Sequence, residues 1–191
     1  MHIAIEGLDG VGKTQTAKLL AKTLGFEFIE KPLHYLTDLQ GMDNYLRIMN
    51  TINTEMGPEF TSLYYGLSNL YLTHLAQGKN VVTDRHLCST YFWNHTESTA
   101  PFFNYLVNVC GSPDFTVILY ATEEVRRTRI KGRNPNDPDL NEKVLPNKSY
   151  QKMLEFVQRY NMRYIWLDTS DMNLQAVIQQ IVSQVHNSRE M

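Results

Sequence analysis

The chain has 191 residues, of which 42% are hydrophobic and 20% charged, and it contains two cysteines, Cys88 and Cys110. This length and composition predict a single domain over residues 1–191, and two cysteines are too few for a disulfide framework or a four-ligand zinc site. The formal net charge of -2 indicates no nucleic-acid partner, and no apolar stretch is long enough for a membrane anchor, so we expect a cytoplasmic protein.

The predicted strands are short apolar runs, and stretches long enough for helices separate them. These runs are Ile3–Glu6, Glu27–Glu30, Val81–Asp84, Phe115–Tyr120 and Tyr164–Leu167. Such an alternation predicts a parallel sheet that is covered by helices on both faces. After the first strand, apolar residues recur at helical spacing from Ala17 to Leu24, and Gly25 is the expected C-terminal cap of that helix.

The second half of the chain contains one irregular segment and one clear helix. Between the fourth and fifth predicted strands, residues 132–148 are polar and rich in proline and asparagine, which predicts a loop. After the fifth strand, Ser170 or Asp171 is the expected N-cap of a helix whose apolar face runs from Leu174 to Val185.

A phosphate-binding motif follows the first predicted strand. Gly7, four further residues, Gly12, Lys13 and Thr14 satisfy the pattern G-x-x-x-x-G-K-[ST]. Because the motif lies between a strand and a helix, backbone N–H groups at the positive end of the helix can converge on phosphates. Lys13 is expected to reach the β- and γ-phosphates, and the Thr14 hydroxyl to bind Mg²⁺. The expected phosphate-binding residues are Gly7, Gly10, Val11, Gly12, Lys13, Thr14 and Gln15.

A nucleoside triphosphate site is compatible with three classes of protein. These are a phosphotransferase with an acceptor pocket, a nucleotide-operated switch and an NTP-driven machine. A GTPase switch is expected to carry N-K-x-D, and the nearest match, "NKSY" at residues 147–150, has Tyr150 in place of the aspartate. The switch therefore loses most of its support.

A second charged cluster follows the third predicted strand. Asp84 and Arg85 stand at its carboxyl end, which is where open α/β sheets bind their ligands. A carboxylate there can hold Mg²⁺ or accept a proton, and the guanidinium can bind a phosphate with two parallel hydrogen bonds. The alternative is a purely structural ion pair.

Two stretches together carry a specific resemblance. "IAIEGLDGVGKTQTA" at 3–17 and "VVTDRHLCST" at 81–90 resemble the thymidylate kinase branch of the P-loop kinases, with deoxynucleoside kinases as close relatives. The similarity continues through 112–133 and 165–170. It implies an α/β three-layer sandwich with a five-stranded parallel sheet, a lid at about 132–148 and Mg-ATP as donor. It also implies a deoxynucleoside monophosphate as acceptor, first of all dTMP, and a homodimer.

The resemblance also suggests roles for residues near the acceptor. Asp9 resembles the acidic loop residue that faces the acceptor sugar, and Asp84 and Arg85 resemble the pair beside the acceptor phosphate. Ser89 matches a residue that follows this pair. Trp93 falls where the family has an aromatic residue near the nucleotide.

A basic helix precedes the predicted lid. Arg126, Arg129 and Arg133 are spaced so that they share one helix face that leads into the loop. In the family that this chain resembles, a comparable segment supplies arginines to the transferred phosphoryl group, so Arg129 and Arg133 are the candidates here. The alternative is a basic helix that is only solvated.

The chain departs from the thymidylate kinase pattern at two places. The arginine that usually follows the second strand is missing from "EKPLHY" at 30–35, and the thymine-reading arginine is missing from "LYYGLSNLY" at 63–71. The residues expected in their place are Lys31 or His34 after the strand, Ser68 or Asn69 on the helix, and Tyr64 or Tyr65 as a stacking ring.

These departures leave two further functions open. One is a deoxynucleoside kinase, in which Asp84 would act as the base for a 5′-hydroxyl group. The other is an ATP-binding protein that has lost its reaction. Deoxynucleoside kinases typically lack the loop aspartate, so Asp9 favours a monophosphate kinase.

Overall fold

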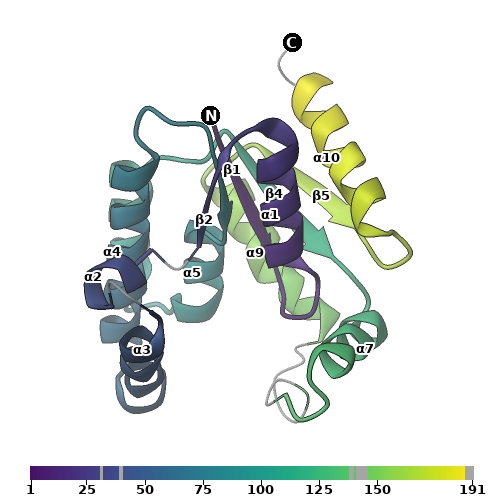
Figure 1. Cartoon of the computed structure of the whole chain (residues 1–191). Coiled ribbons are helices and arrows are strands. Elements are labelled where there is room, and N and C mark those ends of the chain that lie inside the picture. Colours follow the sequence, from purple (N-terminus) through teal and green to yellow (C-terminus); the bar gives the residue numbers. More distant parts are fainter. Residues whose placement is uncertain (31, 39–40, 138–139, 141–145, 188–191) are drawn as a thin grey trace.

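Five parallel strands form one sheet in the computed structural model, which describes residues 1–30, 32–38, 41–137, 140 and 146–187 (Figure 1). The strands are β1 (His2–Gly7), β2 (Glu27–Glu30), β3 (Val81–Asp84), β4 (Phe115–Tyr120) and β5 (Tyr164–Asp168). Their order across the sheet is β2-β3-β1-β4-β5, and every neighbouring pair is parallel. The predicted parallel sheet and its strands are confirmed.

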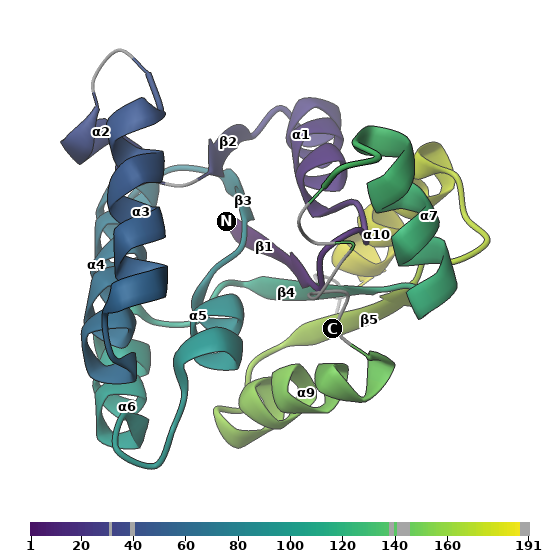
Figure 2. The same ribbon diagram turned by 90° about the horizontal axis from the view of Figure 1, so that it is seen from below.

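Helices cover both faces of this sheet, as the alternation of apolar runs predicts. They are α1 (Lys13–Leu24), α2 (His34–Thr37), α3 (Asp43–Glu55), α4 (Pro58–Ala76), α5 (Leu87–Asn94), α6 (Ala100–Cys110), α7 (Glu123–Arg133), the 3-10 turn η1 (Asn147–Ser149), α9 (Tyr150–Arg159) and α10 (Leu174–Asn187). Figure 2 shows α1 and α10 on one face and α5 and α9 on the other. The chain therefore has the three-layer arrangement that the resemblance implies.

Each face of the sheet has its own apolar core. On one face, Leu20 of α1 and Ile181 of α10 pack with strand residues such as Ile5. On the other face, Phe103 of α6 and Phe156 of α9 pack in a second cluster. Parallel strands buried on both sides are expected to be almost wholly apolar, so a charged residue inside one of them needs a specific partner.

The two terminal helices test the capping predictions. Gly25 ends α1 in the left-handed conformation with φ 67°, and its N–H donates to carbonyls of the last turn, as predicted. The predicted cap of α10 is wrong, because Ser170 is engaged in a turn in which its N–H and hydroxyl donate to Asp168. Asn173 performs the capping, since its Oδ1 accepts the N–H of Ala176 at 2.9 Å.

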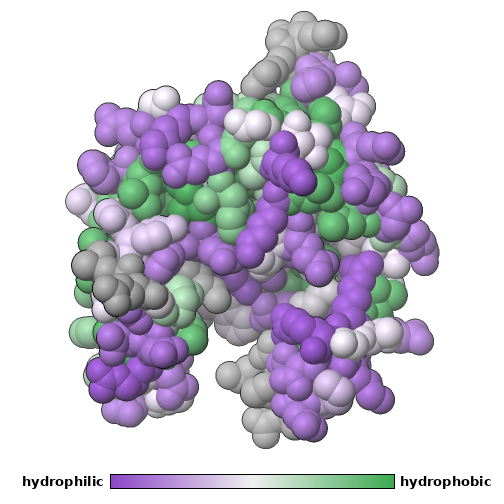
Figure 3. All heavy atoms as spheres, viewed as in Figure 1, coloured by the Kyte–Doolittle hydropathy of each residue, from purple (hydrophilic) through white to green (hydrophobic). Residues whose placement is uncertain are grey.

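The carboxyl ends of the central strands lie at one edge of the sheet, between two projecting groups of helices. Ile5 of β1 pairs with Asp84 of β3, and Gly7 of β1 pairs with Leu119 of β4. In Figure 1, α3 lies on one side of this edge and α7 on the other. Figure 3 shows a hollow in the surface between these two groups.

The structure describes the predicted lid only in part. Of the predicted lid, residues 132–137, 140 and 146–148 are described, and the remainder lies outside the described residues, as does Lys31. Within the described part of the chain, no helix combines the length and the apolar character needed to span a membrane.

Candidate active site

The phosphate loop joins β1 to α1 through three glycines. Gly7 has φ 140°, and a Cβ atom there would lie 2.5 Å from the carbonyl oxygen of Leu119. Gly10 has φ 82°, and a Cβ atom there would lie 2.7 Å from the carbonyl oxygen of Arg126. Gly12, which directly precedes α1, is also left-handed. Side chains would be both strained and crowded at Gly7 and Gly10, so the loop can follow this path only with glycine.

Lys13 begins α1 and is almost completely buried, with an exposed fraction of 6%. Its Nζ donates to the carbonyl oxygen of Leu8 at 2.9 Å and lies 3.4 Å from Oδ1 of Asp9. Burial, together with the nearby charge of Arg85, lowers the pKa of Lys13 to about 8, against the opposing effect of Asp9. A phosphate in the loop would supply the negative charge that this desolvated ammonium lacks.

Thr14 and Asp84 form the candidate Mg²⁺ site. The Thr14 hydroxyl donates to Oδ2 of Asp84, which brings the loop and the end of β3 together. The other carboxylate oxygen of Asp84, Oδ1, is buried and has no hydrogen-bond partner among the described residues. Hydroxyl and carboxylate oxygens are ligands that Mg²⁺ prefers. The unpaired buried oxygen therefore fits a cation.

A Mg²⁺ site that is completed by substrate phosphates needs few protein ligands. Mg²⁺ is usually held by one or two side chains together with water and substrate phosphates. The described part of the chain contains no group of three or more His, Cys, Asp or Glu side chains that could hold a metal ion.

Asp9 and Arg85 connect the phosphate loop with the turn after β3. Nη2 of Arg85 lies 2.7 Å from Oδ1 of Asp9, the same oxygen that faces Lys13. Burial alone would raise the pKa of Asp9, but the charges of Lys13 and Arg85 outweigh it and lower the pKa to about 2. Asp9 therefore stays ionised and offsets both cations.

Arg85 itself has an unusual backbone. Its φ of 75° lies in the left-handed region, which a residue with a side chain occupies at a cost of about 1–3 kcal/mol. Such strain is concentrated at functional sites, where surrounding contacts impose the conformation.

Glu6 is a buried carboxylate that the sequence interpretation did not single out. It lies on β1 with an exposed fraction of 0%, and it accepts hydrogen bonds from the N–H groups of His86 and Ser89 and from the Ser89 hydroxyl. Burial raises its pKa to about 7, although Ser89 and Arg85 act in the opposite direction. The available signal was its position, because an acidic residue interrupts the apolar run Ile3–Gly7.

Three tyrosines of α3 and α4 interact with one another, and the charge of Arg85 acts on two of them, Tyr45 and Tyr65. Tyr45 is 5% exposed. Burial and, to a smaller extent, its interactions with Tyr64 and Tyr65 raise the pKa of Tyr45 above the usual range, whereas the charge of Arg85 lowers it. The Tyr64 hydroxyl is buried without a hydrogen-bond partner among the described residues, whereas the Tyr65 hydroxyl donates to Asn53 at 2.9 Å. Tyr64 was predicted, and Tyr45 was not.

The remaining predicted site residues differ in burial and in their hydrogen-bond partners. Nδ2 of Asn69 donates to Oγ1 of Thr90 at 2.7 Å and to a backbone oxygen at 2.9 Å, so its amide joins α4 to α5. Ser89 lies beside Arg85, with its hydroxyl 3.4 Å from Nη1. Trp93 is 47% exposed, and Gln15 of the phosphate loop motif is exposed on α1.

Helix α7 is hydrogen-bonded to the backbone of the phosphate loop. Arg126 is fully buried and donates to backbone oxygens of Asp9 and Ala121 and to Oδ1 of Asn147, each at 3.2–3.3 Å. Its guanidinium therefore supports the backbone of the phosphate loop and also contacts Asn147, which belongs to the predicted lid.

The two predicted lid arginines have different partners. Arg129 donates to the carbonyl oxygen of Val11 at 3.3 Å and to Thr169, with the shortest contact at 2.6 Å. Arg133 is 62% exposed at the end of α7, and its Nη2 lies 2.5 Å from Oδ2 of Asp137. In this conformation Arg129 contacts the loop backbone, and Arg133 pairs with a residue of the predicted lid.

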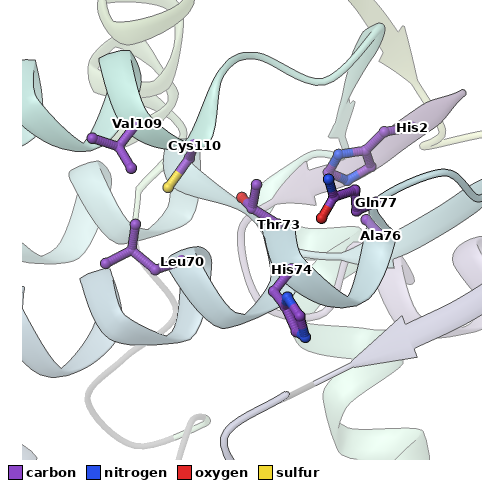
Figure 4. A pocket seen from close by; sticks show the side chains of 8 residues that line it. All are labelled: His2, Leu70, Thr73, His74, Ala76, Gln77, Val109 and Cys110. Atoms are coloured by element: carbon purple, nitrogen blue, oxygen red, sulfur yellow. The ribbon is translucent and has the colours of Figure 1, made fainter.

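Two other cavities lie away from this cluster. One has a volume of about 450 Å³ and lies near His2, at the end of β1 opposite the phosphate loop. Figure 4 shows its lining, which comes from β1, from α4 with the residue that follows it, and from α6: His2, Leu70, Thr73, His74, Ala76, Gln77, Val109 and Cys110. The other, about 750 Å³, runs between α5 and α9 and includes Trp93 as its one predicted site residue. Neither cavity is lined by Asp9, Lys13 or Arg85.

Comparison with known proteins shows similarity to kinases over most of the chain. A family model described as thymidylate kinase matches residues 5–181. A protein of Methanocaldococcus jannaschii named a probable thymidylate kinase is 26% identical over 192 residues, which cover 98% of this chain and 96% of that protein. A Thermococcus kodakarensis protein, provisionally named an adenylate kinase, is 26% identical and is matched over 96% of this chain and 84% of its own length.

Solved structures agree on the fold. Deoxyadenosine kinase from M. mycoides, with the products dCMP and a flexible dCDP bound, superposes with a TM-score of 0.65. The match covers 98% of this chain and 100% of that chain at 18% identity.

Proposed function

The chain belongs to the thymidylate kinase family, and we propose that it transfers the γ-phosphoryl group of ATP to a deoxynucleoside monophosphate, with dTMP as the leading candidate. The observation that carries this proposal is the shared position of Asp9 between Lys13 and Arg85. A loop that bound only ATP would have no need of this carboxylate. Asp9 and Arg85 supply a second set of groups that suits an acceptor with its own phosphate.

The donor is held by the phosphate loop. Backbone N–H groups at the start of α1 surround the phosphates, and the ammonium of Lys13 stabilises the charge that moves between donor and acceptor. The Thr14 hydroxyl and the Asp84 carboxylate would hold Mg²⁺. When bound, this ion neutralises charge on the β- and γ-phosphate oxygens.

The acceptor is held from the turn after β3. Arg85 carries two parallel donors, which match a phosphate in a way that a lysine cannot. Its contact with Asp9 orients the guanidinium, and the same carboxylate can accept a hydrogen bond from a hydroxyl of the acceptor sugar. Ser89 adds a hydroxyl beside this arginine.

The lid is the third part of the proposal. We assign it to residues 132–148, with Arg129 and Arg133 as the cations that approach the transferred group. The contact of Arg129 with Val11 supports this assignment, because it brings a guanidinium to the phosphate loop. Arg133 stands at the end of α7, where a change in the following segment would reorient it. Movement of such a lid admits the substrates and then excludes water.

The base of the acceptor depends on the surface of α3 and α4. The amide of Asn69 already donates to Thr90, whereas the Tyr64 hydroxyl has no hydrogen-bond partner among the described residues, so Tyr64 is the better candidate to contact a base or sugar. Relatives that are named thymidylate kinases and adenylate kinases match similarly, so a panel of bases is needed in any assay.

One observation favours a second function. Oδ1 of Asp84 has no hydrogen-bond partner within the described part of the chain, and a carboxylate oxygen at this place could accept the proton of a 5′-hydroxyl group. The chain would then be a deoxynucleoside kinase. The pairing of Arg85 with the loop residue Asp9 favours the monophosphate instead.

We also propose that the protein is a cytoplasmic homodimer. Exposed apolar residues follow α4 at helical spacing, namely Phe60, Leu63 and Leu67, and α6 exposes Tyr105 and Val109. The two helices pack closely, since a Cβ atom at Gly66 would lie 2.6 Å from Phe102. Apolar surface of this kind suits a subunit interface. Sedimentation of the wild type and of Leu63→Lys tests this part.

The proposed activity is tested by ADP release from Mg-ATP in the presence of individual deoxynucleosides and their monophosphates. We expect turnover with at least one monophosphate and none with the matching nucleoside. Turnover confined to nucleosides would support the second function. No turnover with any compound would indicate an ATP-binding protein without this reaction.

A further inference from the structure

Glu6 is the one fully buried carboxylate among the described residues of β1, and the proposed chemistry does not use it. Its side chain points toward the turn between β3 and α5. Oε1 accepts the N–H of His86 at 2.8 Å and that of Ser89 at 3.3 Å, and Oε2 accepts the Ser89 hydroxyl. All three hydrogen bonds therefore come from His86, which follows Arg85 directly, and from Ser89 in the first turn of α5.

These hydrogen bonds cap α5 from another element. The first N–H groups of a helix lack partners within the helix, and a nearby residue usually supplies an oxygen. His86 precedes α5 but makes no side-chain cap. The side chain of Glu6 accepts these N–H groups instead.

The same hydrogen bonds constrain Arg85 on both sides. The N–H of Arg85 donates to the carbonyl oxygen of Ile5 at 3.0 Å, and the next N–H, that of His86, donates to Glu6. Consecutive residues of β1 thus hold both ends of the one-residue turn in which Arg85 has φ 75°. The Ser89 hydroxyl adds a direct connection, since it donates to Glu6 and accepts from Nη1 of Arg85 at 3.4 Å.

We propose that Glu6 is a positioning residue, which holds Arg85 in the strained conformation that directs its guanidinium toward Asp9 and the acceptor phosphate. This inference rests on the proposed function, because it takes Arg85 as the group that binds the acceptor. It assigns to Glu6 an effect on acceptor binding that a residue serving only the core would not have.

The test is Glu6→Gln, which keeps the size of the side chain but turns an NH₂ group toward the Ser89 hydroxyl. We expect the KM for the monophosphate to rise at least about tenfold, equivalent to about 1.4 kcal/mol, while the KM for ATP changes less than about twofold. Ile118→Val is the matched control, since Ile118 pairs with Glu6 across the sheet and its variant removes core volume without touching Arg85. It should leave both constants unchanged.

A second variant addresses the route from Glu6 to Arg85. Ser89→Ala removes the connecting hydroxyl at a helical position where alanine is well tolerated. It should raise the KM for the monophosphate, and adding Glu6→Gln should raise it by less than the product of the separate effects, because the two residues act through one connection. Independent, multiplicative effects would contradict this route.

Hydrogen exchange separates failure of this inference from failure of the proposed function. The amides of His86 and Ser89 should exchange at least about tenfold faster in Glu6→Gln than in the wild type. If monophosphates are phosphorylated but the variant keeps its acceptor KM, the inference is wrong and the proposed function stands. If monophosphates are not accepted at all, the proposed function is wrong, and unchanged exchange would then also overturn the holding role of Glu6.

Discussion

Oδ1 of Asp9 lies 2.7 Å from Nη2 of Arg85 and 3.4 Å from Nζ of Lys13, so a single carboxylate oxygen joins the two cations of the site. A negative charge in a loop that binds phosphates is unfavourable if the loop serves ATP alone. It becomes favourable when it sets the spacing between a cation for the donor and a cation for the acceptor. This relationship leads to predictions about stability, pH dependence and binding.

Asp9→Asn should change the acid stability of the protein. The folded-state pKa of Asp9, about 2, lies below its ordinary value of 3.8, so its ion pairs stabilise the fold above pH 4 and are lost as the pH falls toward 2. We expect the free energy of unfolding to favour the wild type by about 2 kcal/mol more at pH 5 than at pH 2. Urea unfolding of both proteins across this range measures the difference. A difference that does not depend on pH would contradict the ion pairs.

Lys13 should limit ATP binding at alkaline pH. Its pKa of about 8 means that the ammonium loses its proton above this pH, well before an ordinary lysine would. We expect the KM for ATP to rise steadily between pH 8 and pH 10 in the wild type. In Lys13→Arg, the remaining activity should lack this rise, because a guanidinium stays charged throughout. A constant KM in the wild type would show that Lys13 keeps its proton.

Arg126→Met should destabilise the fold strongly. The substitution removes a fully buried guanidinium and leaves the backbone oxygens of Asp9 and Ala121 without their donor. We expect a loss of roughly 3 kcal/mol or more in the free energy of unfolding. Arg127→Met is the matched control, since the neighbouring Arg127 is 49% exposed and pairs with Glu123. That variant should cost less than about 1 kcal/mol, and equal losses would count against a supporting role for Arg126.

Gly10→Ala should abolish tight ATP binding. Its Cβ atom would lie 2.7 Å from the carbonyl oxygen of Arg126 at a φ of 82°, so the loop would have to move. Gly57→Ala is the control, because Gly57 has a φ of -73° and a Cβ atom there would lie 3.5 Å from Oε2 of Glu59, an ordinary contact distance. This second variant should bind ATP normally. Calorimetric titration with ATP distinguishes the two, and normal binding by Gly10→Ala would disprove the crowding.

The strands and the phosphate loop were predictable because their signals are local. Buried parallel strands are continuous apolar runs, and the spacing from Gly7 to Thr14 encodes a strand, a tight loop and a helix in one motif. Local signals failed at the start of α10, because Ser170, Asp171 and Asn173 can each cap a helix. Only the geometry of the turn before the helix makes Asn173 the N-cap.

The parts that were not predictable depend on contacts between distant segments. Glu6 meets Ser89 across 83 positions, and Arg126 meets Asp9 across 117. The helical pattern places Arg126 on the same face as Arg129, but it cannot show that this face covers the underside of the phosphate loop. Similarly, Tyr45 on α3 gives no sign in the sequence that it approaches Arg85.

The most direct test of the acceptor assignment compares a deoxynucleoside monophosphate with its nucleoside in binding to the wild type and to Arg85→Ala. Isothermal titration should use the base with the fastest turnover, with a non-hydrolysable ATP analogue and Mg²⁺ present. We expect the monophosphate to bind the wild type at least about tenfold more tightly than the nucleoside, and this preference to disappear in Arg85→Ala. Equal affinity of the wild type for both ligands, or an equal loss of both in the variant, would contradict the assignment of Arg85 to the acceptor phosphate.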